Sequence, residues 1–153
     1  MPETTSPAGI VHGRGRSWIT TTSGWAFKGS IPGADGAATG EAFYRDKLAR
    51  QLRGLVEVAL PFGRADVATT TDVFEVEPVD RWRHGVRQVL AYAVQCNLVP
   101  NIALFGETTK DERLRMYLRL RDKLRCECVL WLYGPTYGWY RVTSRPAALR
   151  VPR

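Results

Sequence analysis

Three segments of the chain carry apolar residues at the spacing of an amphipathic helix. Residues 41–53 combine strong helix formers with spaced apolar positions, and Gly54 is the expected stop. Residues 82–97 repeat apolar residues at i, i+3, i+4 and i+7, with Asp80 as the expected N-cap. Residues 111–125 predict a third helix. The expected inward-facing residues of the second helix are Val86, Val89, Leu90, Ala93, Val94 and Asn97, and those of the third are Leu114, Tyr117, Leu118 and Leu124.

Short apolar or alternating runs between these helices predict strands. The segments are 55–61, 64–69, 73–79, 101–105, 128–133 and 137–142. A tight turn is expected at 70–72, and Pro78 is expected to end the third strand as an edge or exit. Strands with helices between them predict an α/β fold, in which helices flank a mixed central β-sheet.

The first forty residues have a different composition from the rest. They are rich in Gly, Ser, Thr, Pro and Ala, and residues 1–15 predict a flexible arm. Residues 17–28 predict a short hairpin that turns near Ser23 and Gly24. Residues 41–153 are therefore expected to form a single domain, as the length of 153 residues also indicates.

The composition excludes several classes of protein. A chain that is 44% hydrophobic and 10% aromatic is too apolar for a disordered protein, and no apolar run is long enough to cross a membrane. The three cysteines, Cys96, Cys126 and Cys128, are too few for a disulfide framework and cannot supply four thiolates to an iron–sulfur cluster. A reduced, cytoplasmic protein is the expectation.

The net charge of +7 is unevenly divided along the chain. Residues 1–80 carry 8 basic and 10 acidic groups, whereas residues 81–153 carry 14 basic and 5 acidic groups. A surplus of arginine with few acidic neighbours favours a polyanionic partner, most simply nucleic acid, although a solvated basic face would have the same composition.

Acidic residues gather on the hairpin formed by the second and third strands. The side-chain period of two places Glu75 and Glu77 on one face, with Phe74 and Val76 on the other, and a short turn places Asp66 opposite Glu75 or Glu77. Grouped carboxylates repel one another unless a cation lies between them, and hard oxygen ligands suit Mg²⁺ or Mn²⁺. The alternative is a solvated outer face of an edge hairpin.

These motifs, in this order, resemble the PD-(D/E)XK nuclease superfamily, in particular its RecB-like exonuclease branch. The resemblance covers roughly residues 41–133. The matching residues are Glu41 in the first helix, the segment Gly63-Arg64-Ala65-Asp66, the segment Glu75-Val76-Glu77, and Gln88 with Tyr92 in the second helix. It implies a restriction-endonuclease-like αβββαβ core and hydrolysis of phosphodiester bonds by metal-activated water.

The resemblance also implies roles for individual residues. Asp66 and Glu75 are expected to bind Mg²⁺ or Mn²⁺, and Glu41 to approach the metal directly or through water. Gln88 is expected to orient the site, with Tyr92 in support one helical turn further on. His84 lies on the same helical stripe, at the four-residue spacing, and is a weaker candidate for a supporting role.

One departure from the family pattern is large, because Glu77 stands where the family has a lysine. Glu77 could act as a general base or as another metal ligand. Alternatively, the cation is supplied by the start of the next helix, from Arg81, Arg83, His84 or Arg87. The third alternative is that catalysis has been lost and only a binding shell remains.

Two further groups of residues are candidates for contacts with nucleic acid. Arg115 and Arg119 share one face of the third helix and could contact the phosphate backbone, or they could form a solvated basic face. The aromatic loop 134–140 could stack on bases of a single strand, although a packed turn is the simpler expectation.

The preferred hypothesis is a small, Mg²⁺- or Mn²⁺-dependent deoxyribonuclease, in which Glu77 joins Asp66, Glu75 and Gln88 at the catalytic site. A homodimer, or a subunit of a defence, recombination or mobile-element system, is expected from its small size. The alternatives are a catalytically inactive DNA-binding or assembly module on the same fold, and an unrelated α/β domain that binds an acidic protein. The sequence does not distinguish DNA from RNA.

Overall fold

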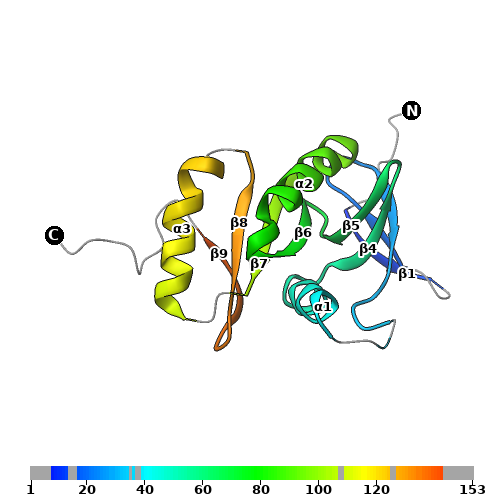
Figure 1. The fold of residues 1–153 in the computed structure, drawn as a ribbon. Coiled ribbons are helices and arrows are strands. Elements are labelled where there is room, and N and C mark those ends of the chain that lie inside the picture. Colours follow the sequence, from blue (N-terminus) through cyan, green and yellow to red (C-terminus); the bar gives the residue numbers. More distant parts are fainter. Residues whose placement is uncertain are drawn as a thin grey trace.

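The centre of the protein is a six-stranded mixed sheet (Figure 1). This computed structural model describes residues 8–13, 17–34, 36, 39–106, 109–124 and 127–142. The strands lie in the order in which they occur in the sequence, with β6–β7 and β7–β8 parallel and the other neighbours antiparallel. They are β4 (Leu55–Leu60), β5 (Gly63–Ala68), β6 (Asp72–Pro78), β7 (Val99–Phe105), β8 (Val129–Gly134) and β9 (Gly138–Val142).

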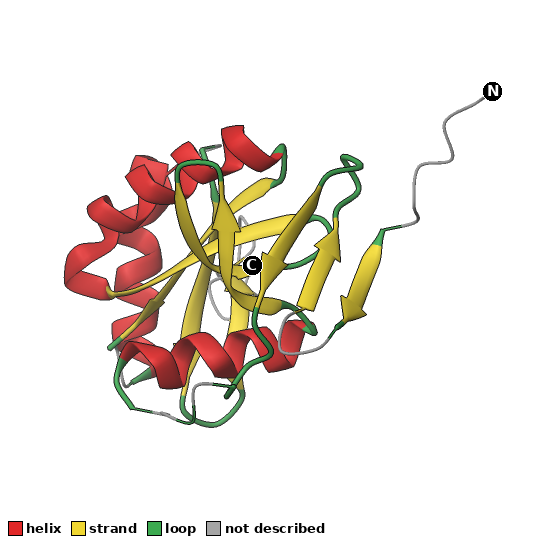
Figure 2. Ribbon diagram, turned by 90° about the vertical axis from the view of Figure 1, so that its right-hand side faces the viewer, coloured by secondary structure: helices red, strands yellow, loops and turns green. Residues whose placement is uncertain are grey.

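Helices cover both faces of this sheet (Figure 2). One face packs against α2 (Trp82–Cys96) and α3 (Lys110–Leu124), and the other packs against α1 (Glu41–Leu52). Strand β8 shows the division, because Leu130 and Leu132 pack with α3 whereas Trp131 and Tyr133 pack with α1. Alternate residues of a strand point to opposite faces, so α1 and α3 lie on opposite sides of the sheet. The α/β fold and the predicted order of its elements are confirmed.

A second, three-stranded antiparallel sheet lies beside β4. It consists of β1 (Gly9–His12), β2 (Ser17–Thr20) and β3 (Ala26–Gly29), and the backbone of Ser30 pairs with Val56 of the main sheet. Ile19 and Phe27 of this sheet pack with Val89 on the α2 side. The predicted hairpin is therefore confirmed, whereas the predicted flexible arm is wrong for Gly9–His12, which pairs with β2.

Several details of the helices differ from the sequence-based expectations. Asp80 is not the N-cap of α2, because a 3-10 turn (Val79–Arg81) precedes the helix and no side chain caps it. Val94 and Leu118 are exposed rather than inward-facing, and Met116 and Leu120 fill the core position expected for Leu118. The strand ending at Pro78 is central, so Pro78 marks an exit and not an edge.

Residues 1–7 of the predicted arm, Arg125 and Cys126 lie outside the described residues. Within the described part of the chain, no helix is both long enough and apolar enough to cross a membrane.

Candidate functional site

Strands β4 and β5 each change face at one residue, and these two residues lie opposite each other. Leu55 and Val58 are three residues apart yet pack into the same core cluster, and so do Ala65 and Ala68. In a regular strand such residues would point to opposite faces. The change occurs across Glu57, whose φ of 52° is unusual for a strand residue, and across Asp66. The pairing between β4 and β5 is recorded on either side of these two residues but not at them.

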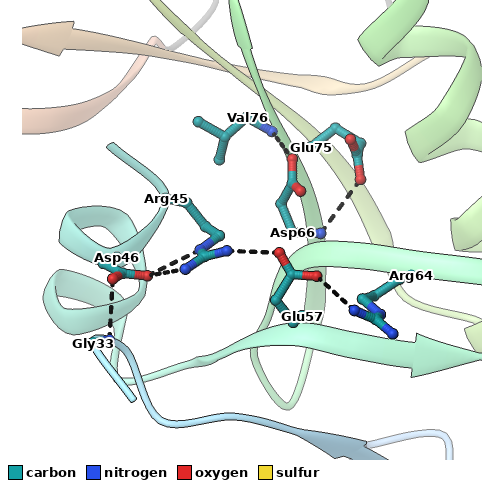
Figure 3. A network of polar contacts seen from close by, with 8 residues as sticks. All are labelled: Gly33, Arg45, Asp46, Glu57, Arg64, Asp66, Glu75 and Val76. Carbon is teal, nitrogen blue, oxygen red and sulfur yellow. Dashed lines mark hydrogen bonds and ion pairs between the residues drawn. The ribbon is translucent and has the colours of Figure 1, made fainter. Parts of the chain in front are cut away.

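Strands β5 and β6 separate at the same level. Their recorded pairing ends at Val67 with Phe74, and continuing it would place Asp66 opposite Glu75. Side chains occupy the gap instead. The Val76 N–H donates to Asp66 Oδ2 at 2.8 Å, and the Asp66 N–H donates to Glu75 Oε1 at 3.3 Å (Figure 3). The two carboxyl groups therefore replace the backbone ladder and lie beside each other.

The environment of these two acids opposes ionisation of both. Glu75 is only 4% exposed, and burial followed by the charge of Asp66 raises its pKa to about 10. Burial also raises the pKa of Asp66, against the lowering effect of the Val76 hydrogen bond. A divalent cation would offset both the burial and the repulsion, because it favours the charged form of each carboxyl group.

Glu77 is a third buried acid on the same strand. It is 5% exposed, and its Oε2 atom has no hydrogen-bond partner among the described residues. The nearest cation, Arg81 Nε, lies 3.9 Å away, which is beyond hydrogen-bond distance. Burial and the charge of Glu41 raise the pKa of Glu77 to about 7. A buried oxygen without a partner is costly in a folded protein, and its partner is then an ordered water, an ion or a substrate group.

Gly85 allows helix α2 to lie directly over Glu77. A Cβ atom at this position would come within 2.8 Å of Glu77 Cγ and 2.5 Å of Ile102 Cδ1. Real Cβ atoms do not approach other atoms so closely, so any larger residue would push the helix or the acid away. The glycine thus fixes the burial of Glu77 beneath α2.

A cavity of about 240 Å³ opens beside Asp66 on the α1 side of the sheet. Glu75 and Glu77 do not line it, because they point to the face opposite to Phe74 and Val76. Its lining residues are Glu41, Ala42, Arg45, Glu57, Asp66 and Val76. Glu41 is exposed at the first position of α1. Its charge contributes to the raised pKa of both Asp66 and Glu77, which places it within electrostatic reach of both acids.

Sequence reasoning missed two residues of this cavity, Arg45 and Glu57. Arg45 is buried; its Nη1 lies 2.6 Å from Glu57 Oε1 and its Nη2 lies 2.9 Å from Asp46 Oδ1. Arg64 reaches the other oxygen of Glu57 at 3.4 Å, and Asp46 accepts a hydrogen bond from the Gly33 N–H (Figure 3). The sequence signal was present but weak: Arg45 falls on the same face of the helix as Glu41, at the i+4 position.

Residues of α2 lie on the other side of the acids. The Tyr92 ring is close to Gly63, where an added Cβ would be 2.8 Å from Tyr92 Cε1. Burial and the charge of Glu75 raise the pKa of Tyr92, which places the ring near the acidic pair. Gln88 is half-buried and has no hydrogen-bond partner within the described part of the chain, so the orienting role stays a prediction.

The predicted basic residues fall into two groups. Arg81, Arg83, His84 and Arg87 are exposed at the start of α2, and Arg83 stacks over Trp82 at 4.6 Å. Arg115 and Arg119 are exposed on α3, which covers the sheet face opposite to the cavity. Contact of either group with nucleic acid stays a prediction.

The carboxylate oxygens of these acids are the kind of ligand that a hard divalent cation prefers, although the acids do not surround a common point. Among the described residues, no group of three or more His, Cys, Asp or Glu side chains is arranged as a metal-binding cluster. However, Mg²⁺ is commonly held by one or two carboxylates, with water and substrate phosphate completing the shell. The adjacent carboxyl groups of Asp66 and Glu75 fit this requirement, and the partnerless oxygen of Glu77 is a further donor nearby.

Comparisons with known proteins do not assign this chain to a family. No protein family, no curated protein and no solved structure matches it. The argument for function therefore depends on the geometry of the site.

Proposed function

We propose that the protein is a metal-dependent nuclease of the PD-(D/E)XK type. The observation that carries this proposal is the interlocked pair of Asp66 and Glu75, which occupies the gap between two central strands, with Asp66 at the wall of a cavity. A buried pair of acids at this position weakens the metal-free fold. A divalent cation bound by the two carboxylates would offset this loss of stability and would explain why the acids are buried together.

Asp66, Glu75 and, through water or directly, Glu41 would hold Mg²⁺ or Mn²⁺. When bound, such an ion polarises a phosphoryl oxygen and lowers the pKa of a coordinated water. The Val76 N–H fixes the orientation of Asp66, since this hydrogen bond leaves only one carboxylate oxygen without a backbone partner. Arg45 lines the same cavity, where its guanidinium group pairs with Glu57 and Asp46 and would hold these carboxylates in place beside an entering phosphate.

We assign proton transfer to Glu77. A general base is most effective when its pKa lies near the working pH, and burial together with Glu41 brings the pKa of Glu77 to about 7. Its buried Oε2 atom has no hydrogen-bond partner among the described residues and is the oxygen that would accept this proton. In this assignment the glutamate takes the place of the lysine that the family resemblance leads one to expect.

The first test is cleavage of plasmid and single-stranded DNA with Mg²⁺, Mn²⁺ or EDTA. Metal-dependent cleavage is expected, and Asp66→Asn and Glu75→Gln should each reduce it by about 100- to 1,000-fold, as expected for loss of a preorganised charge. Asp72→Asn is the matched control, because Asp72 begins the same strand but contacts Asn101 and Thr71 outside the cavity.

Two results would contradict the proposal. Cleavage that persists in EDTA, or that survives both substitutions, would exclude the acidic pair as its source. No cleavage under any condition, together with salt-dependent binding to DNA, would favour the alternative of an inactive DNA-binding module on the same fold.

A further inference from the structure

We propose that an aromatic surface beside the cavity binds unpaired bases, so that the substrate is single-stranded nucleic acid. This inference rests on the proposed nuclease function and names its substrate class. The aromatic platform, as we call it, consists of Phe43, Tyr44, Phe105 and Tyr133. These residues come from α1, β7 and β8, and they meet on the α1 face of the sheet.

The platform is held rigidly by contacts between its rings. Tyr44 stacks on Phe105 with centroids 4.0 Å apart and planes 9° apart. Phe43 and Tyr133 both meet Tyr44 edge to face, at 5.2 and 4.9 Å. The buried Trp139 packs edge to face against Tyr133, with ring centroids 5.4 Å apart. A prearranged set of rings loses little conformational entropy when a flat ligand stacks on it.

The platform is also open to solvent and carries a positive charge. Phe43 is 40% exposed, and the other three rings are half-buried. Lys47 Nζ lies 5.6 Å from the Phe43 ring and donates a hydrogen bond to Tyr133 Oη at 3.0 Å. Aromatic rings interleaved with a cation are the combination that binds bases and the phosphates between them.

Two chain connections join the platform to the acidic cavity. Glu41 and Ala42 line the cavity, and Phe43 is the next residue of α1. On the sheet, Phe105 pairs with Pro78, which lies two residues beyond the cavity-lining Val76 on the same face of β6. A phosphate placed at the acids would therefore bring a neighbouring nucleotide to the platform.

Such a surface discriminates between single and double strands. The faces of bases inside a duplex are already covered by their neighbours, so a protein ring can stack only on an unpaired or flipped base. Lys47, in contrast, would attract the backbone of either form. The rings should thus contribute to binding of single strands and very little to binding of duplexes.

The experiment compares binding of one fluorescent oligodeoxynucleotide, alone or annealed to its complement, in EDTA so that no cleavage occurs. Phe43→Ala and Phe43→Leu should each raise the Kd for the single strand about tenfold, a change of about 1.4 kcal/mol, and leave the duplex Kd unchanged. Phe43→Leu keeps an apolar contact with Tyr44, which guards against a folding defect. Trp25→Ala is the matched control, because Trp25 is 51% exposed in the β2–β3 connection. The Thr22 N–H of this connection donates to the Thr70 carbonyl, which precedes the other end of β6.

Three outcomes would overturn the inference: unchanged binding of the single strand, an equal loss for both forms, or a change in oligomeric state without a change in binding. The last would identify the platform as an interface between copies of this chain. The assay contains no divalent metal, so its result is separate from the cleavage test. If only the nuclease proposal is correct, cleavage depends on metal but the Phe43 variants bind single strands normally. If only the platform proposal is correct, the Phe43 variants bind single strands less tightly but the protein does not cleave DNA.

Discussion

Strand β6 carries two buried polar clusters, and their hydrogen bonding differs sharply. At its start, Asn101 of β7 is 1% exposed and fully bonded: its amide donates to Asp72 and Val99, and its oxygen accepts from Trp131 Nε1. Further along, Glu75 and Asp66 lie side by side, and Glu77 keeps a buried oxygen without a partner among the described residues. One cluster satisfies its own groups, and the other does not.

Under the proposed function, this difference separates a structural cluster from a functional one. Buried polar groups that satisfy one another make a fold specific, whereas a group left without a partner costs free energy and persists only for another reason. Under the proposed function, the cluster at the start of the strand completes the core, whereas the cluster further along would bind a cation and a substrate. Each prediction below would remove or sharpen this distinction.

The largest expected effect concerns Glu77 and cleavage. If Glu77 accepts the proton, Glu77→Gln should reduce cleavage by about 100-fold or more while binding of DNA in EDTA stays unchanged. Glu77→Lys restores the residue typical of the family and should also lose cleavage, because a lysine there replaces the base. The measurement is the single-turnover rate with Mn²⁺ and a saturating enzyme concentration.

The outcome for Glu77→Lys decides between two roles of this position. Cleavage equal to or above that of the unmodified protein would show that Glu77 is merely tolerated and that the site operates with a cation. Cleavage by Glu77→Gln at the full rate would exclude both the base and the ligand role.

The second prediction contrasts the stability of Asn101→Ala with that of Glu75→Gln. Asn101→Ala leaves Asp72 and Trp131 without their buried partner and should destabilise the fold by about 1–3 kcal/mol. Glu75→Gln should stabilise the metal-free protein at alkaline pH, because it removes an acid that must ionise within the core. The measurement is thermal unfolding of both variants across pH.

The sign of the pH effect follows from the raised pKa values. In the folded protein the pKa of Glu75 is about 10 and that of Glu77 is about 7, both above the ordinary value of 4.5. The contribution of each acid to the free energy of unfolding is therefore full below pH 4.5. It is lost as pH rises through about 7 for Glu77 and about 10 for Glu75. The metal-free protein should therefore lose stability over this range. Mg²⁺ at 100 times its Kd should raise the free energy of unfolding by about 2.7 kcal/mol. An equal increase with Mg²⁺ in the Glu75→Gln variant would contradict the proposed metal site.

The fold could be predicted from the sequence further than the site could. The spacing of apolar residues predicted α1, α2 and the strands, because the buried face of each element follows from the residues of that segment alone. The parity of Glu75 and Glu77 was also correct, since Phe74 and Val76 pack in the α1-side core. Their burial was not foreseen, because it depends on β7 and α2 covering both sides of a strand that the sequence presents as part of a hairpin.

Other features of the site have no local signal at all. Strands β4 and β5 change face at Glu57 and Asp66. Neither position is occupied by a glycine or a proline, the residues that would have indicated an irregular strand in the sequence. The burial of Arg45 likewise requires a carboxylate from β4, twelve residues further along the chain. Pairings between distant segments are what a periodic pattern cannot specify.

The smallest expected effect concerns which arginines contact the substrate. Arg64 is exposed on β5 beside Glu57, at the edge of the cavity, and its loss should reduce the salt dependence of single-strand binding by about 0.7 in log–log slope, the value of one phosphate contact. Arg115 and Arg119 lie on the opposite face, so Arg115→Ala with Arg119→Ala should leave the slope unchanged. A decrease of about 1.4 for the double variant would instead show that the strand continues around the sheet to α3. In that event the acidic cavity would be only part of a longer binding track, and the basic second half of the chain would contribute directly to affinity rather than to solubility alone.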